Sequence, residues 1–163
     1  MDAIITLNKV AKTIRKKRIN NGAIIFDKSE IKFKLDEKNN PKEVVFKTAK
    51  SANKLIEEFM LLANKRVAEK MKKGKERFVY RVHDQPDEEK LKNLQTVVKR
   101  LGYNLELNKN RLNDSLNTLL ENTFGKNEQN LIDTLMIRSM SKAEYTTKNI
   151  GHYGLAFDNY THF

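Results

Sequence analysis

The sequence predicts an α+β fold that is mostly helical, with about five α-helices packed with a small antiparallel β-sheet. Apolar residues recur at helical spacing in about five segments, and residues 22–48 between the first two of them are β-prone and partly alternating. A length of 163 residues suits one domain with a hydrophobic core. No repeat, low-complexity tract or composition shift marks a second domain.

The first helix is expected over residues 3–19, where apolar residues line one side and lysines the other. It ends in the basic run Arg15–Arg18 before Asn20-Asn21-Gly22 stops it. Cations at a helix C-terminus offset the helix dipole, and they also bind phosphate groups. The sequence leaves both roles open for this run.

A small antiparallel sheet is expected over residues 22–48. Ala23–Phe26 is β-prone, and residues 31–35 alternate apolar and lysine side chains as a half-buried strand does. The turn signal Asn39-Asn40-Pro41 follows, and a third strand is expected from Glu43 to Lys47.

The strongest helical pattern covers residues 50–73 and ends at Gly74. Asn53, Glu57 and Asn64 point within about 40° of one another and border the apolar stripe of this helix. Such a row is either an internal set of hydrogen bonds or a polar strip facing a groove. In a groove, Glu57 would accept hydrogen bonds from hydroxyl groups such as those of ribose.

The rest of the chain predicts one extended run and three further helices. The extended run is residues 78–82, and a helix over residues 86–101 follows, with Pro86 in its first turn. Two more helices are expected at roughly 111–123 and 127–144.

The chain is strongly basic, with 32 Lys and Arg against 21 Asp and Glu and a formal net charge of +11. This balance suggests a polyanionic partner, with nucleic acid first and an anionic membrane surface second. The absence of Cys excludes disulfides and thiolate chemistry and fits a reducing cytoplasm. No apolar run approaches the ~20 residues of a membrane span, and the N-terminus has no secretion signal.

Several classes of catalytic site are not supported by the sequence. There is no Gly-x-Ser-x-Gly elbow, no His pair with the spacing of a zinc protease, and no Gly-rich phosphate loop. Most carboxylates neighbour lysines on expected helix surfaces, which is typical of solvated charge pairs.

Phe26 is a candidate for base stacking. It ends an expected strand directly before Asp27-Lys28-Ser29, a turn-like stretch in a basic neighbourhood. Stacking of an aromatic ring on an unpaired base contributes about 1–3 kcal/mol. The alternative is an ordinary core phenylalanine.

Five stretches of the chain together resemble the RNB family, the ribonuclease II and ribonuclease R exoribonucleases. The likeness spans almost the whole chain, and the ribonuclease R branch is the more similar. The stretches are Gly22–Phe26, Leu55–Asn64, Tyr80–Pro86, Arg138–Ala143 and Asn149–Phe163.

The resemblance implies a magnesium-dependent enzyme that degrades RNA processively from its 3′ end to nucleoside 5′-monophosphates. The family holds Mg²⁺ with a cluster of Asp residues, expected before Met1, and has a catalytic Arg in a Thr-Ser-Pro-Ile-Arg segment, expected after Phe163. Residues 1–163 are therefore expected to be an internal part of the catalytic domain, forming part of the wall of a narrow channel for single-stranded RNA. We expect no catalytic residue, metal ligand, bound Mg²⁺ or nuclease activity in this chain.

Two site residues follow from the resemblance. Phe26 matches an aromatic residue that clamps the stacked bases at the 3′ end. Glu57 matches a carboxylate that contacts the terminal ribose and helps to select RNA over DNA. Similarity alone does not distinguish Glu57 from its neighbour Glu58, although the row with Asn53 and Asn64 favours Glu57.

Two other interpretations remain open from the sequence. One is a stand-alone basic RNA-binding or scaffold protein without catalysis, and the other is a structural helical domain whose charge serves only solubility. The gene sequence before Met1 and after Phe163 would distinguish them. If the chain is a piece of a larger domain, an exposed sheet edge or apolar surface would favour self-association.

Overall fold

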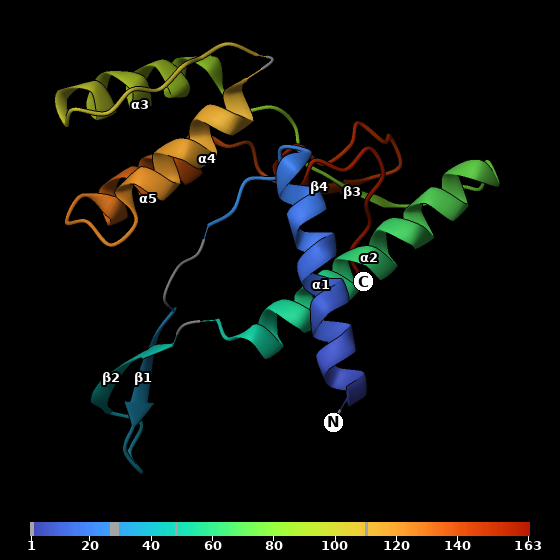
Figure 1. Ribbon diagram of the computed structural model, residues 1–163, viewed down its shortest axis with the longest axis horizontal. Coiled ribbons are helices and arrows are strands. Elements are labelled where there is room, and N and C mark those ends of the chain that lie inside the picture. Colours follow the sequence, from blue (N-terminus) through green and yellow to red (C-terminus); the bar gives the residue numbers. More distant parts are fainter. Residues whose placement is uncertain (1, 27–29, 48, 110) are drawn as a thin grey trace.

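The computed structural model describes residues 2–26, 30–47, 49–109 and 111–163. The described residues form five α-helices and two small antiparallel sheets, which confirms the expected mostly helical α+β class. Figure 1 shows their arrangement. The elements are α1 Asp2–Asn20, β1 Glu30–Leu35, β2 Pro41–Lys47, α2 Ser51–Lys73, β3 Tyr80–Val82, α3 Glu88–Arg100, α4 Leu112–Thr123, α5 Gln129–Ser139, β4 Glu144–Thr146 and a 3₁₀ turn, η1, at Tyr153–Leu155.

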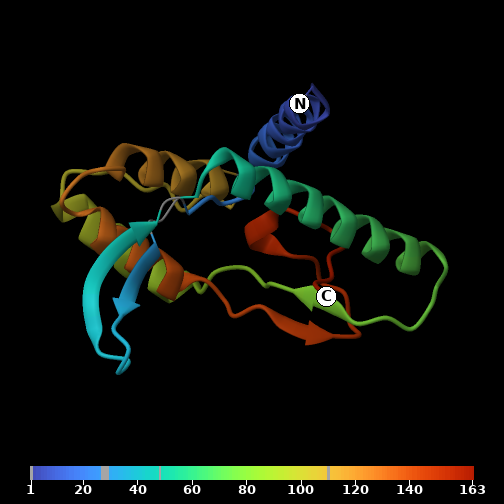
Figure 2. The ribbon, with the colours of Figure 1, turned by 90° about the horizontal axis from the view of Figure 1, so that it is seen from below.

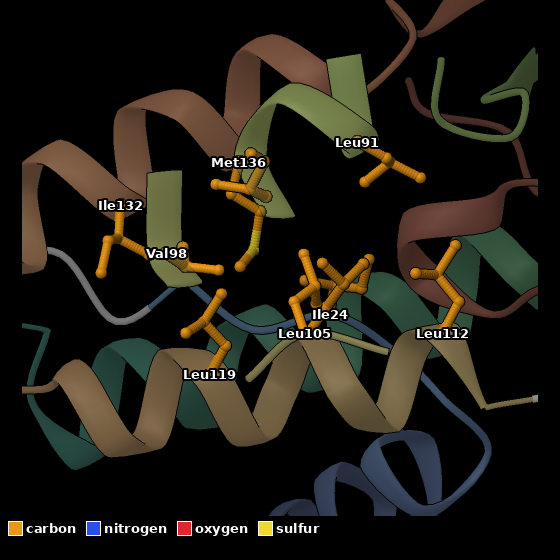
Figure 3. Packing of buried hydrophobic residues seen from close by; sticks show 10 residues of the cluster. Ile24, Leu91, Val98, Leu105, Leu112, Leu119, Ile132 and Met136 are labelled. Atoms are coloured by element: carbon orange, nitrogen blue, oxygen red, sulfur yellow. The ribbon is translucent and has the colours of Figure 1, made fainter. Parts of the chain in front are cut away.

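The main hydrophobic core lies among α3, α4 and α5 (Figure 3). Leu91, Leu94 and Val98 recur at intervals of three and four on α3, so that all three face the core. The helix begins where the Asp87 carboxylate accepts the backbone N–H of Lys90 at 2.9 Å. The sequence placed Pro86 inside this helix, whereas the structure places Pro86 before the cap.

Ala23–Phe26 is not a strand, although the sequence predicted one. Its backbone groups bond to α4 and the C-terminal segment instead of a neighbouring strand. Asn117 Nδ2 donates to the Ala23 carbonyl at 3.0 Å, and the Ile24 N–H donates to the Gly154 carbonyl at 3.0 Å. These partners satisfy the Ala23 carbonyl and the Ile24 N–H without a neighbouring strand.

The strands β1 and β2 form a hairpin that lies apart from α3, α4 and α5 in Figure 1. Phe33 and Val44 pair across it, and both side chains are at least half exposed. Lys34 and Glu43 form an ion pair at 2.8 Å in the register next to them, which places charge on the other face. The expected alternation is present, but the apolar face is exposed and not half-buried.

The second sheet joins β3 to β4, with Tyr80 opposite Thr146 and Val82 opposite Glu144. The sequence predicted helix as far as residue 144, but α5 ends at Ser139, whose hydroxyl donates to the Met136 carbonyl at 2.7 Å. Long-range pairing with β3 outweighs the local helical pattern of these residues.

Helix α2 runs alongside the β3–β4 sheet (Figure 2), and a small second core of Ala68, Tyr80 and Val82 joins them. The C-terminal segment also bonds to β3, because the Arg81 N–H donates to the Tyr160 carbonyl at 3.0 Å. Tyr160 and His162 lie next to α2, where both contact Asn64. No helix among the described residues has the length and apolar character needed to cross a bilayer.

Candidate nucleic-acid interface

The adjacent acids Glu57 and Glu58 have opposite environments. Successive helix residues point about 100° apart, so neighbours on α2 face different surroundings. The Glu58 side chain is 1% exposed, whereas the Glu57 side chain is 49% exposed. Of the two side chains, only that of Glu57 is accessible to a ligand from solvent.

Glu58 is neutralised by two arginines of α1. Arg18 Nη2 lies 2.5 Å from Glu58 Oε1, and Arg18 Nε donates to Oε2 at 3.3 Å. Arg15 Nη1 lies 3.4 Å from the same Oε1. A buried carboxylate requires such partners, because an unpaired charge away from water is strongly unfavourable.

This pairing divides the basic run Arg15–Arg18 into two parts. Arg15 and Arg18 turn toward α2, and the Arg18 side chain is only 4% exposed. Lys16 and Lys17 are exposed to solvent. Neither of the two roles considered for this run includes the one that the structure shows for the arginines, which join α1 to α2, while Lys16 and Lys17 remain exposed.

A groove of about 450 Å³ runs along α2. The expected row of Asn53, Glu57 and Asn64 lies on its wall, and residues of the C-terminal segment complete it. The wall is mostly apolar with a few polar groups, as is typical of small-ligand sites. Its lining is Ala52, Asn53, Ile56, Glu57, Met60, Leu61, Asn64, Tyr160 and His162.

The row is also partly hydrogen-bonded within the protein. Asn53 Oδ1 accepts the Lys50 N–H at 3.0 Å and so helps to cap α2. Asn64 is buried, and its amide nitrogen lies 3.5 Å from the Tyr160 hydroxyl and 3.4 Å from His162 Nδ1. Both explanations of the row thus hold in part, and Glu57 is its exposed acceptor.

Phe26 lies in a second pocket, of about 370 Å³. The side chain is half-buried, packs against the main core on one side and lines the pocket on the other. Arg15 lines this pocket as well, and its Nη1 lies 3.8 Å from Glu57 Oε1. Phe26 and Glu57 therefore occupy two pockets that Arg15 connects, and not a single cleft. Asp27–Ser29, which the sequence argument placed next to Phe26, lies outside the described residues.

The histidines His83 and His152 form a third group with Tyr153, and their imidazoles are 5.0 Å apart between centroids. His83 Nδ1 accepts the Gly154 N–H at 2.9 Å, so Nε2 donates to the Ser141 carbonyl at 2.8 Å. Burial lowers the pKa of His152 to about 4, with His83 and Arg81 adding to this effect, and burial raises the pKa of Tyr153 to about 12. His152 and Tyr153 are therefore neutral near pH 7, and the hydrogen bonds of His83 hold the C-terminal segment in place.

Residues 2–26, 30–47, 49–109 and 111–163 contain no group of three or more His, Asp or Glu side chains placed to hold a metal ion. The described part of the chain therefore does not fit a Mg²⁺ site of the kind that an Asp cluster provides.

The sequence missed three residues of this interface, namely Arg15, Tyr160 and His162. The sequence left a helix-capping role and a phosphate-binding role open for Arg15, but gave no sign of its pairing with α2. Tyr160 and His162 are about a hundred positions from Asn64 in the chain. Nothing local in the sequence indicated that they border α2.

Comparison with known proteins matches nearly the whole chain to one family. The family model described as RNB domain matches residues 1–163. Ribonuclease R 2 of Lactococcus lactis is 36% identical over 98% of this chain, and ribonuclease R of Thermotoga maritima is 36% identical over 99%. The chain spans 23% of the length of each of these two relatives.

Solved structures share the fold. Mycoplasma genitalium RNase R in complex with ribose methylated single-stranded RNA has a TM-score of 0.90 at 24% identity, covering 99% of this chain and 26% of that one. The same protein in complex with double-stranded RNA has a TM-score of 0.88 at 25% identity, covering 98% and 29%. Yeast Ssd1, described as a pseudonuclease, has a TM-score of 0.66 at 21% identity, covering 97% and 20%.

Proposed function

Because this chain belongs to the RNB family, we propose that it acts as part of a ribonuclease R-like exoribonuclease. That enzyme would hydrolyse single-stranded RNA processively from the 3′ end to nucleoside 5′-monophosphates. Residues 1–163 would form a partial catalytic domain and part of the wall of the RNA channel. We place the enzyme in the cytoplasm, since the chain has no Cys and thus needs no oxidising compartment.

The contrast between Glu57 and Glu58 carries this proposal. Glu57 is a half-exposed carboxylate on the wall of a groove, held near Arg15 and Arg18, while Glu58 satisfies the same arginines from the buried side. An ionised carboxylate only accepts hydrogen bonds, so it favours a ligand that presents hydroxyl groups. The 2′-hydroxyl is the group by which a protein distinguishes RNA from DNA. We propose that Glu57 accepts a hydrogen bond from the terminal ribose.

Phe26 has the role of the stacking residue in this proposal. The pocket that it lines contains several apolar and aromatic side chains, and Arg15 adds a cation to its lining. Every base has a π-face, so stacking there would be tolerant of sequence. Arg15 would connect the position of the last base to that of its ribose, because it lines the pocket of Phe26 and pairs with Glu57.

Catalysis needs groups that the described residues do not supply. We propose that the Asp cluster for Mg²⁺ and the charge-stabilising Arg lie outside these 163 residues, and that this chain alone has no nuclease activity. Mg²⁺, when bound in the whole enzyme, would activate water and stabilise negative charge on the phosphoryl group. The contribution of this chain is to bind and orient the strand.

The alternative is a basic RNA-binding or scaffold protein that does not cut RNA. The similarity in fold to a pseudonuclease is the observation that favours it, since the fold is compatible with a protein so described. Both functions predict RNA binding by this chain. They differ in whether the whole protein degrades RNA in the presence of Mg²⁺.

The first experiment measures binding of this chain to a labelled RNA oligonucleotide and to DNA of the same sequence at low salt. Glu57→Gln should lower the ratio of RNA to DNA affinity by roughly tenfold, the loss expected for one hydrogen bond to a charged acceptor. Glu106→Gln is the matched control, because it removes the same charge from an exposed loop residue outside the groove. An unchanged ratio in Glu57→Gln would count against the ribose contact.

The second experiment incubates the purified chain with labelled RNA and Mg²⁺. We expect no shortening of the RNA over hours, whereas the protein with the whole domain should release nucleoside monophosphates. Degradation by the chain alone would contradict the proposed inactivity. Failure of the whole protein to degrade RNA would favour the scaffold alternative.

A further inference from the structure

The groove along α2 contains a second polar group, His162, that the proposed function does not use. His162 is exposed and lines the same groove as Glu57. Its backbone is fixed on both sides, because Tyr145 Oη donates to the His162 carbonyl at 2.9 Å and Thr161 Oγ1 donates to the Val79 carbonyl at 3.0 Å. The imidazole is therefore attached to a segment that the β3–β4 sheet holds in place.

Two buried side chains determine the orientation of this imidazole. The Tyr160 hydroxyl lies 3.0 Å from His162 Nδ1, and the Asn64 amide nitrogen lies 3.4 Å from the same atom. Tyr160 and Asn64 are each 3% exposed. The ring is thus held in place by two contacts to its Nδ1 atom.

The chemistry of these partners selects one tautomer. An amide nitrogen donates and does not accept, so a hydrogen bond between the Asn64 amide and Nδ1 has Nδ1 as its acceptor. The Tyr160 hydroxyl can then accept from Asn64, at 3.5 Å, and donate to Nδ1. With Nδ1 as the acceptor, the proton of the neutral ring resides on Nε2. Among the described residues no hydrogen-bond partner of Nε2 is found.

We propose that the Nε2–H of His162 donates a hydrogen bond to a phosphate oxygen of the nucleic-acid strand that occupies the α2 groove. This inference rests on the proposed function and adds a second contact to the same site. Glu57 can only accept and takes a hydroxyl group, whereas the Nε2–H of His162 can only donate and needs an acceptor. A phosphate oxygen is the acceptor that every nucleotide carries, whatever its base or sugar.

The two contacts therefore differ in what they recognise. Loss of Glu57 weakens RNA and spares DNA, because DNA lacks the 2′-hydroxyl. Loss of His162 weakens RNA and DNA by the same factor, because both carry the phosphate. This difference separates the inference from the proposed function in a single set of binding measurements.

The test compares His162→Gln with His162→Asn in the full chain, using the RNA and DNA oligonucleotides described above. The amide nitrogen of a glutamine reaches close to the position of the histidine Nε2. The side chain of asparagine is shorter, and its amide reaches only to the position of Nδ1. We expect His162→Gln to bind within about threefold of the wild type. His162→Asn and His162→Ala should each lose roughly tenfold for both RNA and DNA.

Tyr160→Phe is the second variant, and it keeps the packed ring while removing the hydroxyl that binds Nδ1. We expect a smaller loss than in His162→Ala, again equal for RNA and DNA. Nitrogen-15 NMR of the free wild-type chain should show that the neutral form of His162 carries its proton on Nε2. Thermal unfolding of each variant checks that the fold is retained.

The outcomes decide between the two ideas. Equal binding by the Gln and Asn variants, a loss confined to RNA, or a proton on Nδ1 would overturn the phosphate contact of His162. In that case, if Glu57→Gln still lowers the ratio of RNA to DNA affinity as expected, the proposed function would stand. Absence of saturable RNA binding by the wild-type chain at low salt would overturn both.

Discussion

The guanidinium of Arg18 on α1 and the carboxylate of Glu58 on α2 form a buried ion pair, with 2.5 Å between Nη2 and Oε1. The side chains are 4% and 1% exposed. The pair joins two helices that are 40 residues apart at these positions and cross in Figure 1. The neighbouring Glu57 lies on the wall of the groove, with its Oε1 3.6 Å from the same Arg18 Nη2.

Removal of the buried acid should destabilise the protein far more than removal of its neighbour. Glu58→Ala leaves Arg18 buried without its counter-charge, and we expect a loss of about 3–5 kcal/mol in the free energy of unfolding. Glu57→Ala is the matched control, and for this half-exposed acid we expect about 0–1 kcal/mol. Urea unfolding followed by circular dichroism measures both. Equal losses would show that the pair does not join the helices as described.

The ring of Phe26 should contribute to RNA binding through stacking. Phe26→Leu keeps an apolar side chain in the pocket but removes the aromatic face, and we expect binding of single-stranded RNA to weaken by about 1–3 kcal/mol. Phe46→Leu, on the exposed hairpin, is the control and should bind as the wild type does. Fluorescence anisotropy with a labelled oligonucleotide provides the affinities. If both variants bind alike, Phe26 serves only the core.

The stability of the chain should fall between pH 6.5 and pH 4 because of His152. Burial lowers the pKa of its folded form to about 4 from an ordinary value of 6.5, and His83 and Arg81 contribute further. In this window the unfolded state binds a proton that the folded state does not, so acid favours unfolding. The whole shift would be worth about 3 kcal/mol, and for a partly exposed ring we expect about 2 kcal/mol.

His152→Asn tests this assignment, because its side-chain oxygen can replace Nδ1 as acceptor of the Leu155 N–H. The midpoint of urea unfolding, measured from pH 7.5 to pH 4, should depend less on pH in the variant than in the wild type. The dependence should level off below pH 4, where both states of the wild-type histidine are protonated. Parallel curves would assign the pH dependence to other groups.

The apolar face of the β1–β2 hairpin should promote self-association of the isolated chain. The side chains of Phe33 and Phe46 are 59% and 69% exposed, and Leu35 and Val44 are also exposed beside them. Such a face, with the open edges of a two-stranded sheet, is favourable for pairing with a second copy. Phe33→Lys with Phe46→Lys should shift the chain toward monomer in sedimentation velocity without lowering its melting temperature.

Lys32→Ser with Lys34→Ser is the control for this experiment, because it changes the opposite face of the same hairpin. We expect it to leave self-association unchanged or to increase it. A wild-type chain that stays monomeric at all concentrations tested would contradict the prediction.

Local pattern was enough to predict the helices. Leu91, Leu94 and Val98 repeat at the helical period, and a buried stripe of this kind stabilises a helix wherever it packs. The turn at Asn39 and the alternation in β1 were equally visible, because turn residues and strand period depend on near neighbours. The resemblance of short stretches to the RNB family was also readable in the sequence alone.

Tertiary structure decided what the local pattern leaves open. The segment Ala23–Phe26 has the composition of a strand, yet its hydrogen bonds go to Asn117 and Gly154, far away in the chain. The local pattern of residues 140–144 predicted a helix, but the structure pairs β4 with β3 instead. Composition cannot say which distant partner will satisfy a backbone group, so both were predicted wrongly.

The sequence by itself determined the basic charge, the helical framework and the candidates Phe26 and Glu57. Only the tertiary structure decided that Glu58 and Arg18 are buried together, that Arg15 connects two pockets, and that His162 faces the groove. The physical reason is that burial and pairing depend on which segments meet in space. Side chains of the same type, such as Glu57 and Glu58, therefore take different roles at adjacent positions.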